Sequence, residues 1–170
     1  MIFEKNKLYE VYTDYNEDSF FVSYIIFSSE ELIIIEKIDR NGEYDGISVL
    51  RTDSIMKINS CTGYLKKYKD SKYVDKSDIL TFTKDNTFHN IWEKIKKSNL
   101  LISLYTLDET NTFATVEKTS LENDCVILEL SVYSEDQSDF DGFCQINVEN
   151  IQEFSLDTKY LRFISNQLLR

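Results

Sequence analysis

Two Asp-Gly pairs are the residues of this 170-residue chain whose types and spacing first suggest chemistry. Asp45-Gly46 and Asp141-Gly142 lie 96 residues apart in similar surroundings. Equivalent carboxylates on two loops could bind a metal ion. The same dipeptide is also a hairpin signal, because glycine accepts a positive φ and aspartate hydrogen-bonds to the local backbone. We interpret Asp45, Gly46, Asp141 and Gly142 as structural turn residues.

A second group of carboxylates lies in one acidic loop, at Glu135, Asp136, Asp139 and Asp141. Their closeness suggests a calcium site, but their spacing is out of register with an EF-hand loop, and the glutamate expected at its twelfth position is missing. We therefore expect a solvated loop and no metal ion. Glu135, Asp136 and Asp139 are candidates for contacting a protein partner.

The chain lacks the residue patterns that are typical of enzymes and cofactor sites. His89 is the only histidine, and no serine or cysteine motif accompanies it that would make it a catalytic base. No glycine-rich phosphate loop occurs. Cys61, Cys125 and Cys144 are scattered and form no C-x-x-C pair, which argues against a disulfide framework or a structural zinc site. We expect neither enzymatic activity nor a cofactor.

The net charge of −11 is concentrated in the C-terminal part of the chain. Residues 100–170 carry 4 basic and 13 acidic side chains, a net charge of −9. An acidic surface repels phosphate, so binding to nucleic acid is not expected. A protein partner that docks on this part should be basic, unless the acidity serves only solubility.

The apolar content of 42% is sufficient for a packed core. No run of 18 apolar residues occurs, which argues against a membrane span. Charges lie within the first five residues, so the N-terminus does not resemble a signal peptide. We expect a cytoplasmic protein.

An internal repeat runs through the chain. The stretch YDGISVLRTDSIMKINSCTGYL, Tyr44–Leu65, recurs without a gap as FDGFCQINVENIQEFSLDTKYL, Phe140–Leu161. The spacing between matching residues grows from 92–93 early in the copies to 96 later, which indicates extra residues near Glu122–Cys125 in the second copy. Shorter matches pair Val11–Thr13 with Leu104–Thr106, Phe21–Tyr24 with Phe113–Val116, and Leu32–Asp39 with Leu128–Glu135.

Each copy contains five short β-rich runs separated by turn residues, which is typical of a small bent barrel. Apolar residues at i, i+3, i+4 and i+7 in Asp85–Asn99 predict an amphipathic helix, and the tail from Thr158 predicts a second one. The predicted strands are Leu8–Tyr12, Phe20–Phe27, Leu32–Ile38, Gly46–Arg51 and Ile55–Asn59, followed by Leu101–Tyr105, Thr112–Thr119, Val126–Tyr133, Gly142–Asn147 and Ile151–Leu156.

A helix followed by five strands, with an apolar third strand and a short last hairpin, resembles the Sm-like barrel of Sm, LSm and Hfq proteins. Residues 86–156 follow this order, and residues 7–59 follow it without the helix. Other SH3-like barrels fit the same order. The resemblance implies a mainly β fold with short helices. It contains two tandem five-stranded Sm-like or SH3-like barrels, residues 1–70 and 86–170, joined by a linker at residues 71–85.

The resemblance also implies association through barrel edges, and hence a homo-oligomer, but not the RNA site. In Hfq-like proteins a basic pair entering the last strand contacts RNA, whereas the matching residues here are Thr52, Asp53, Val148 and Glu149. We expect a non-enzymatic protein-interaction module, regulatory, immunity or phage-related, with an unidentified partner. RNA binding is the alternative, through a basic stripe of Lys66, Lys67, Lys72, Lys76, Lys94, Lys96 and Lys97.

Overall fold

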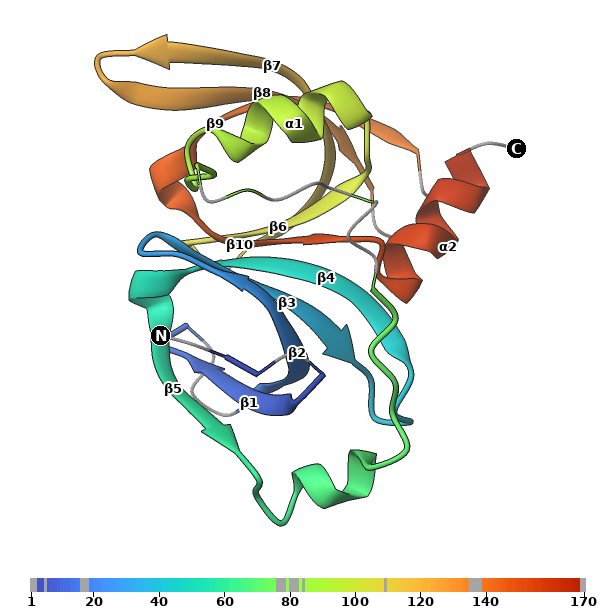
Figure 1. Cartoon of the computed structure of the whole chain (residues 1–170). Helices are drawn as coiled ribbons and strands as arrows, with labels where there is room; N and C mark the ends of the chain where they lie inside the picture. Colours follow the sequence, from blue (N-terminus) through green and yellow to red (C-terminus); the bar gives the residue numbers. More distant parts are fainter. Residues whose placement is uncertain are drawn as a thin grey trace. The chain divides into compact units, whose positions relative to one another are not determined.

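The computed structural model of the chain describes residues 3–4, 6–15, 19–75, 79, 83, 85–108, 110–134 and 139–168. The chain divides into two compact units, Met1–Lys84 and Asp85–Arg170. In the described part, each unit has five antiparallel strands, and two short α-helices lie in the second (Figure 1). The prediction of a mainly β fold with short helices is confirmed. None of the described helices has the length and apolar character needed to span a membrane.

The first unit has the strand order β5-β1-β2-β3-β4. The short 3₁₀ helix η1 (Thr52–Ser54) joins its last two strands, and η2 (Leu65–Tyr68) follows them. The pairings among the described strands leave this order open, so they close no barrel. The strands are β1 (Leu8–Thr13), β2 (Phe21–Ser28), β3 (Leu32–Ile38), β4 (Tyr44–Arg51) and β5 (Ile55–Ser60).

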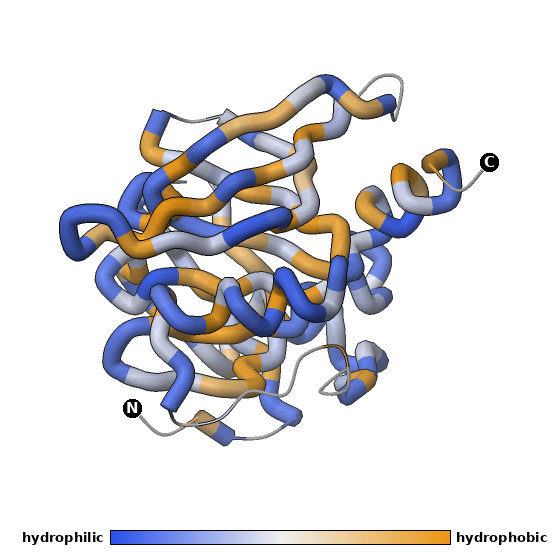
Figure 2. The backbone as a smooth tube through the Cα atoms, turned by 90° about the horizontal axis from the view of Figure 1, so that it is seen from above, coloured by the Kyte–Doolittle hydropathy of each residue, from blue (hydrophilic) through white to orange (hydrophobic). Residues whose placement is uncertain are grey.

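The second unit repeats this arrangement in the order β10-β6-β7-β8-β9. Helix α1 (Ile91–Ser98) precedes its strands, η3 (Val148–Asn150) joins the last two, and α2 (Lys159–Leu168) follows. Helix α2 carries both hydrophilic and hydrophobic residues (Figure 2). The strands are β6 (Ile102–Thr106), β7 (Asn111–Glu122), β8 (Cys125–Tyr133), β9 (Phe140–Asn147) and β10 (Ile151–Leu156).

The two units also share the register of their strand pairs. Equivalent pairs are Val11↔Phe21 and Leu104↔Thr112, Val11↔Ile58 and Leu104↔Phe154, and Ile33↔Leu50 and Leu128↔Ile146. Both second strands have a bulge at the same place, between Ile25 and Phe27 in β2 and between Val116 and Lys118 in β7. The internal repeat predicted from the sequence is therefore also present in the hydrogen-bonded register of the strands.

This register corrects two of the sequence matches by one residue. Leu32 corresponds to Ile127 rather than to Leu128, and Phe21 corresponds to Thr112 rather than to Phe113. The corrections arise in the connections, because Val11 and Phe21 are ten residues apart where Leu104 and Thr112 are eight apart, and Ile33 and Leu50 are 17 apart where Leu128 and Ile146 are 18 apart. The β7–β8 hairpin is also longer than the β2–β3 hairpin. The extra residues predicted near Glu122–Cys125 lie at the end of this hairpin.

The apolar residues of β3 contribute to clusters on both faces of the first sheet, as the run of isoleucines indicated. One cluster contains Tyr9, Val11, Ile25, Ile33, Ile35 and Leu50, and the other contains Val22, Tyr24, Ile38, Leu65 and Tyr68. Residues after η2 also pack on this unit, since the Tyr24 hydroxyl donates to the Ser71 carbonyl at 3.0 Å. Ser71 therefore belongs to the first unit rather than to a linker at residues 71–85.

The core of the second unit forms under α1. All four apolar side chains that predicted the amphipathic helix, Phe88, Ile91, Trp92 and Ile95, are buried. Helix α1 is shorter than the predicted Asp85–Asn99, because Phe88 lies in a turn that precedes it.

Glu10 is a buried carboxylate in β1 whose protonation should weaken the first unit. Its carboxylate accepts hydrogen bonds from the side chains of Thr62, Asn59 and Tyr12. Burial raises the pKa of Glu10, but these hydrogen bonds bring the pKa below its ordinary value of 4.5. Because the folded-state pKa is depressed, the stabilisation is present above pH 4.5 and is lost as the pH falls through the folded-state pKa.

We therefore expect the unfolding free energy of wild type to fall on acidification more steeply than that of Glu10→Gln. Urea unfolding of both proteins at pH 7 and at several values below pH 4.5 measures this difference. Parallel pH dependences for the two proteins would contradict the role assigned to Glu10.

Candidate interaction surface

Six aromatic side chains form a continuous row across the second unit, from β9 to α2. Successive ring centroids are 5.0 Å apart for Phe143 and Phe140, 6.4 Å for Phe140 and Tyr133, 5.3 Å for Phe113 and Tyr160, and 6.4 Å for Tyr160 and Phe163. Tyr133 and Phe113 are a cross-strand pair of β8 and β7. We call Phe143, Phe140, Tyr133, Phe113, Tyr160 and Phe163 the aromatic row.

The two ends of the aromatic row are open to solvent, and its middle is anchored in the core. The exposed fraction is 80% for Phe143, 54% for Phe140 and 57% for Phe163. Phe113 is buried in a cluster with Leu161 and Ile164. Contiguous exposed apolar side chains of this size are typical of interaction sites.

Strand β9 presents an open edge beside these rings. Among the described residues, β9 pairs with β8 alone. An edge strand offers unpaired N–H and C=O groups to another chain. The equivalent strand β4 is buried at Ile47 and Val49, where β9 has the exposed residues Phe143 and Gln145. Strand β9 is therefore exposed at repeat positions where β4 is buried.

Gly142 positions the exposed end of the aromatic row. Its φ is +129°, and the β8–β9 register shifts between Val132 and Tyr133, opposite this glycine. Side chains three residues apart in a regular strand point to opposite faces. The irregularity at Gly142 allows Phe140 and Phe143 to contact each other.

The Asp-Gly pairs lie within strands β4 and β9 and not in the connecting turns. The β3–β4 turn is formed upstream by Asp39, whose Oδ1 accepts hydrogen bonds from the backbone of Asn41 at 2.8 Å and of Glu43 at 3.0 Å. The sequence placed this turn at Asp45-Gly46 because Asp-Gly is a strong hairpin signal. Gly46 has a φ of +90°, so it still requires a conformation that favours glycine.

Replacing Gly142 by valine should lower the unfolding free energy by about 1–3 kcal/mol, because valine disfavours a positive φ. A Cβ at Gly142 would meet no atom within 4 Å, so the cost lies in the backbone rather than in a clash. The same substitution at Gly46 should also destabilise the chain, and Asp53→Asn is the control. Urea unfolding of the three variants tests this, and equally small effects would contradict it.

Acidic side chains flank the exposed end of the aromatic row. Asp141 lies in β9 and Asp139 just before it, and both are exposed. The backbone N–H of Ser134 donates to the Asp139 carbonyl at 2.9 Å, which closes the β8–β9 loop. Glu135 and Asp136, the other predicted partner contacts, lie outside the described residues.

The remaining candidates from the sequence are dispersed. His89 Nε2 lies 2.6 Å from Glu149 Oε1, which ties the turn before α1 to η3. Within the described residues, no group of three or more histidine, cysteine or acidic side chains is placed to hold a metal ion. The lysines of the proposed basic stripe divide between η2 (Lys66, Lys67), the following segment (Lys72) and α1 (Lys94, Lys96, Lys97), and Lys76 lies outside the described residues.

The sequence interpretation missed the aromatic row. A signal was present, because the alignment of the two copies places Phe143 opposite Ile47 and Gln145 opposite Val49. A core strand rarely carries a glutamine where its repeat carries valine.

Comparison of the chain with protein-family models, curated protein sequences and solved structures finds no match.

Proposed function

We propose that the chain is a non-enzymatic protein-interaction module whose second unit binds a partner by adding a strand to β9. The observation that carries this proposal is the coincidence of an open strand edge with the exposed end of the aromatic row. In strand addition, backbone hydrogen bonds supply affinity, and side chains beside the edge supply specificity. Phe140 and Phe143 are suited to the second role, since aromatic residues are enriched among binding hot spots.

The partner segment is basic. Asp139 and Asp141 place negative charge at the edge, and ring faces attract lysine and arginine side chains. The net charge of −9 over residues 100–170 acts in the same direction. Charge of this kind mainly accelerates association, and salt screens it.

We further propose a more specific fold for the two units, namely two tandem Sm-like barrels. Its support is the identical strand order, register and second-strand bulge of the two units. Bulges of this kind bend strands, and the strands of the first unit curve strongly (Figure 1). The RNA-binding alternative has less support, because Asp53 and Glu149 occupy the positions where RNA contacts would be expected.

Binding of extended peptides to the full chain tests this function. We expect a fluorescent peptide of alternating lysine and isoleucine to bind, and its glutamate–isoleucine counterpart not to bind. The affinity should fall between about 50 mM and about 500 mM salt. An oligouridine probe in the same assay tests the RNA alternative, and binding of this probe in place of the basic peptide would overturn the proposal.

Phe143→Asp and Leu121→Asp are a matched pair for this assay. Both side chains are exposed in the second unit, but only Phe143 belongs to the aromatic row. Phe143→Asp should weaken binding of the basic peptide by about tenfold or more, as expected for a hot spot. Leu121→Asp should leave the affinity unchanged, and equal affinities of the two variants would contradict strand addition at β9.

A further inference from the structure

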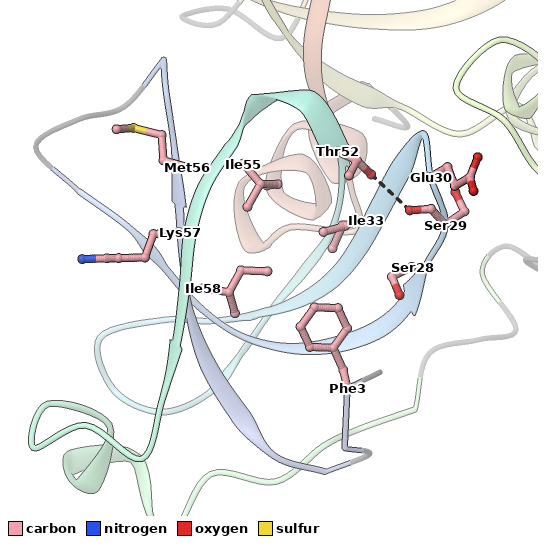
Figure 3. Close-up of a pocket in the computed structure, with 10 residues that line it drawn as sticks. All are labelled: Phe3, Ser28, Ser29, Glu30, Ile33, Thr52, Ile55, Met56, Lys57 and Ile58. Atoms are coloured by element: carbon pink, nitrogen blue, oxygen red, sulfur yellow. Dashed lines mark hydrogen bonds between the residues drawn. The ribbon is translucent and has the colours of Figure 1, made fainter. Parts of the chain in front are cut away.

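The first unit contains an open apolar pocket of ≈ 540 Å³ between β5, η1 and the β2–β3 turn (Figure 3). The side chains of Phe3, Ile33, Ile55 and Ile58 converge on it, whereas Met56 and Lys57 point to the other side of β5. Ser28, Ser29, Glu30 and Thr52 form its polar rim. Ile55 and Ile58 are only partly buried, although they belong to the fifth strand of the repeat.

The strand register identifies the equivalent place in the second unit. Ile58 and Phe154 occupy the same position, as do Ile55 and Ile151, and Ser28 and Thr119. Phe154 and Ile151 are fully buried. The equivalent of the pocket is therefore filled in the second unit.

Helix α1, with the turn before it, fills that place. The ring of Trp92 lies 4.5 Å from the ring of Phe154, and that of Phe88 lies 6.0 Å from it. The hydroxyl of Thr119 donates a hydrogen bond to Glu93.

The turn before α1 adds a polar contact, the pair of His89 and Glu149 at 2.6 Å. The three residues that make these contacts have counterparts at or beside the pocket of the first unit. Phe154 corresponds to Ile58, Thr119 to Ser28, and Glu149 to Asp53, which adjoins the rim residue Thr52.

The first unit has no helix before β1 among its described residues. Of the residues described before β1, Phe3 lines the pocket, and its ring centroid lies 5.4 Å from that of Tyr9. One half-buried phenylalanine stands where the second unit places four buried side chains. The pocket therefore has counterparts of residues that hold α1 in the second unit, and no described helix of the first unit precedes β1 to fill it.

We propose that this pocket binds an amphipathic helix of a partner protein in the way that the second unit holds α1. The helix presents large apolar side chains at i, i+3, i+4 and i+7, which is the spacing of Phe88, Ile91, Trp92 and Ile95. A basic residue at i+1 faces Asp53, whose side chain is 72% exposed and also pairs with Arg51 at 3.3 Å, and an acidic residue at i+5 accepts from Ser28. The site is independent of β9, because it lies in the other unit and takes a helix rather than a strand.

A synthetic peptide with the sequence of residues 85–99 is the probe for this site. We expect saturable binding of the fluorescently labelled peptide to the full chain, measured by anisotropy. A peptide with alanine at the positions of Phe88 and Trp92 should not bind. In methyl NMR spectra, the unlabelled peptide should shift the signals of Ile33, Ile55 and Ile58. Shifts confined to Ile91, Ile95 and Ile151 would show exchange with α1 and overturn the proposal.

Asp53→Lys and Asp70→Lys are matched charge reversals on exposed positions of the first unit. Asp53→Lys should weaken binding of the peptide several-fold, whereas Asp70→Lys should not change it. Phe143→Asp should also retain wild-type affinity for this peptide, which separates the pocket from the β9 site. Equal affinity of Asp53→Lys and wild type, or the absence of saturable binding, would overturn the proposal.

Discussion

Ile47→Asp is expected to unfold the first unit, whereas Phe143→Asp should leave the unfolding free energy within about 0.5 kcal/mol of wild type. The two residues occupy the same position of the repeat, since Ile47 pairs with Glu36 and Phe143 pairs with the equivalent Ser131. Ile47 is fully buried, and its cross-strand neighbour Glu36 is a buried carboxylate. A second carboxylate there would be desolvated and repelled, at a cost above about 4 kcal/mol.

Urea unfolding followed by circular dichroism compares the two variants. Ile47→Val is the control, with an expected loss of about 0.5–1.5 kcal/mol. Because Phe143→Asp adds a charge in contact with solvent, the urea midpoint of this variant should match that of wild type. A stable Ile47→Asp protein, or a Phe143→Asp protein that unfolds, would contradict the contrast between the buried β4 and the exposed β9.

Trp92→Ala should lower the unfolding free energy of the second unit by about 3–5 kcal/mol. Trp92 is fully buried, and its ring packs against those of Phe88 and Phe154. The loss of this ring would leave a cavity between α1 and β10. Trp92→Phe should cost much less, because the buried indole Nε1 has no hydrogen-bond partner among the described residues.

Thermal and urea unfolding of both Trp92 variants measure this effect, with Phe163→Ala as a control at an exposed aromatic position. Phe163→Ala should stay within about 0.5 kcal/mol of wild type. If Trp92→Ala were no more destabilising than Phe163→Ala, α1 would not be part of the core. The inference that α1 fills the equivalent of the pocket in the second unit would then have no support.

The strands could be predicted from the sequence because their signals are local. Leu32–Ile38 and Ile151–Leu156 coincide with β3 and β10, where runs of β-branched and large apolar residues lie between turn residues. Helix α1 could be predicted because its buried side chains recur with helical spacing. The 96-residue repeat also predicted the equivalence of β4 with β9 and of β5 with β10, since no insertion interrupts these strands.

The interaction surface and the pocket could not be predicted in this way, because they depend on what covers each residue. Asp-Gly indicates a backbone that needs a positive φ, but only the strand register extends β9 to Phe140 and brings Phe140 against Phe143. Phe143 has a large apolar side chain, as core residues do, but it is 80% exposed. Hydrophobicity specifies the free energy gained on burial, and it does not specify which neighbour performs the burial.

The sequence by itself determined two copies of a five-stranded antiparallel unit, because alternation, turn residues and helical spacing act over a few neighbouring residues. The tertiary structure decided which of the equivalent positions are buried in each copy and which are exposed. The fourth strand is buried in the first unit and exposed in the second, whereas the site of α1 is open in the first and filled in the second. These differences arise from packing between segments far apart in the chain, so they follow from the folded register and not from local pattern.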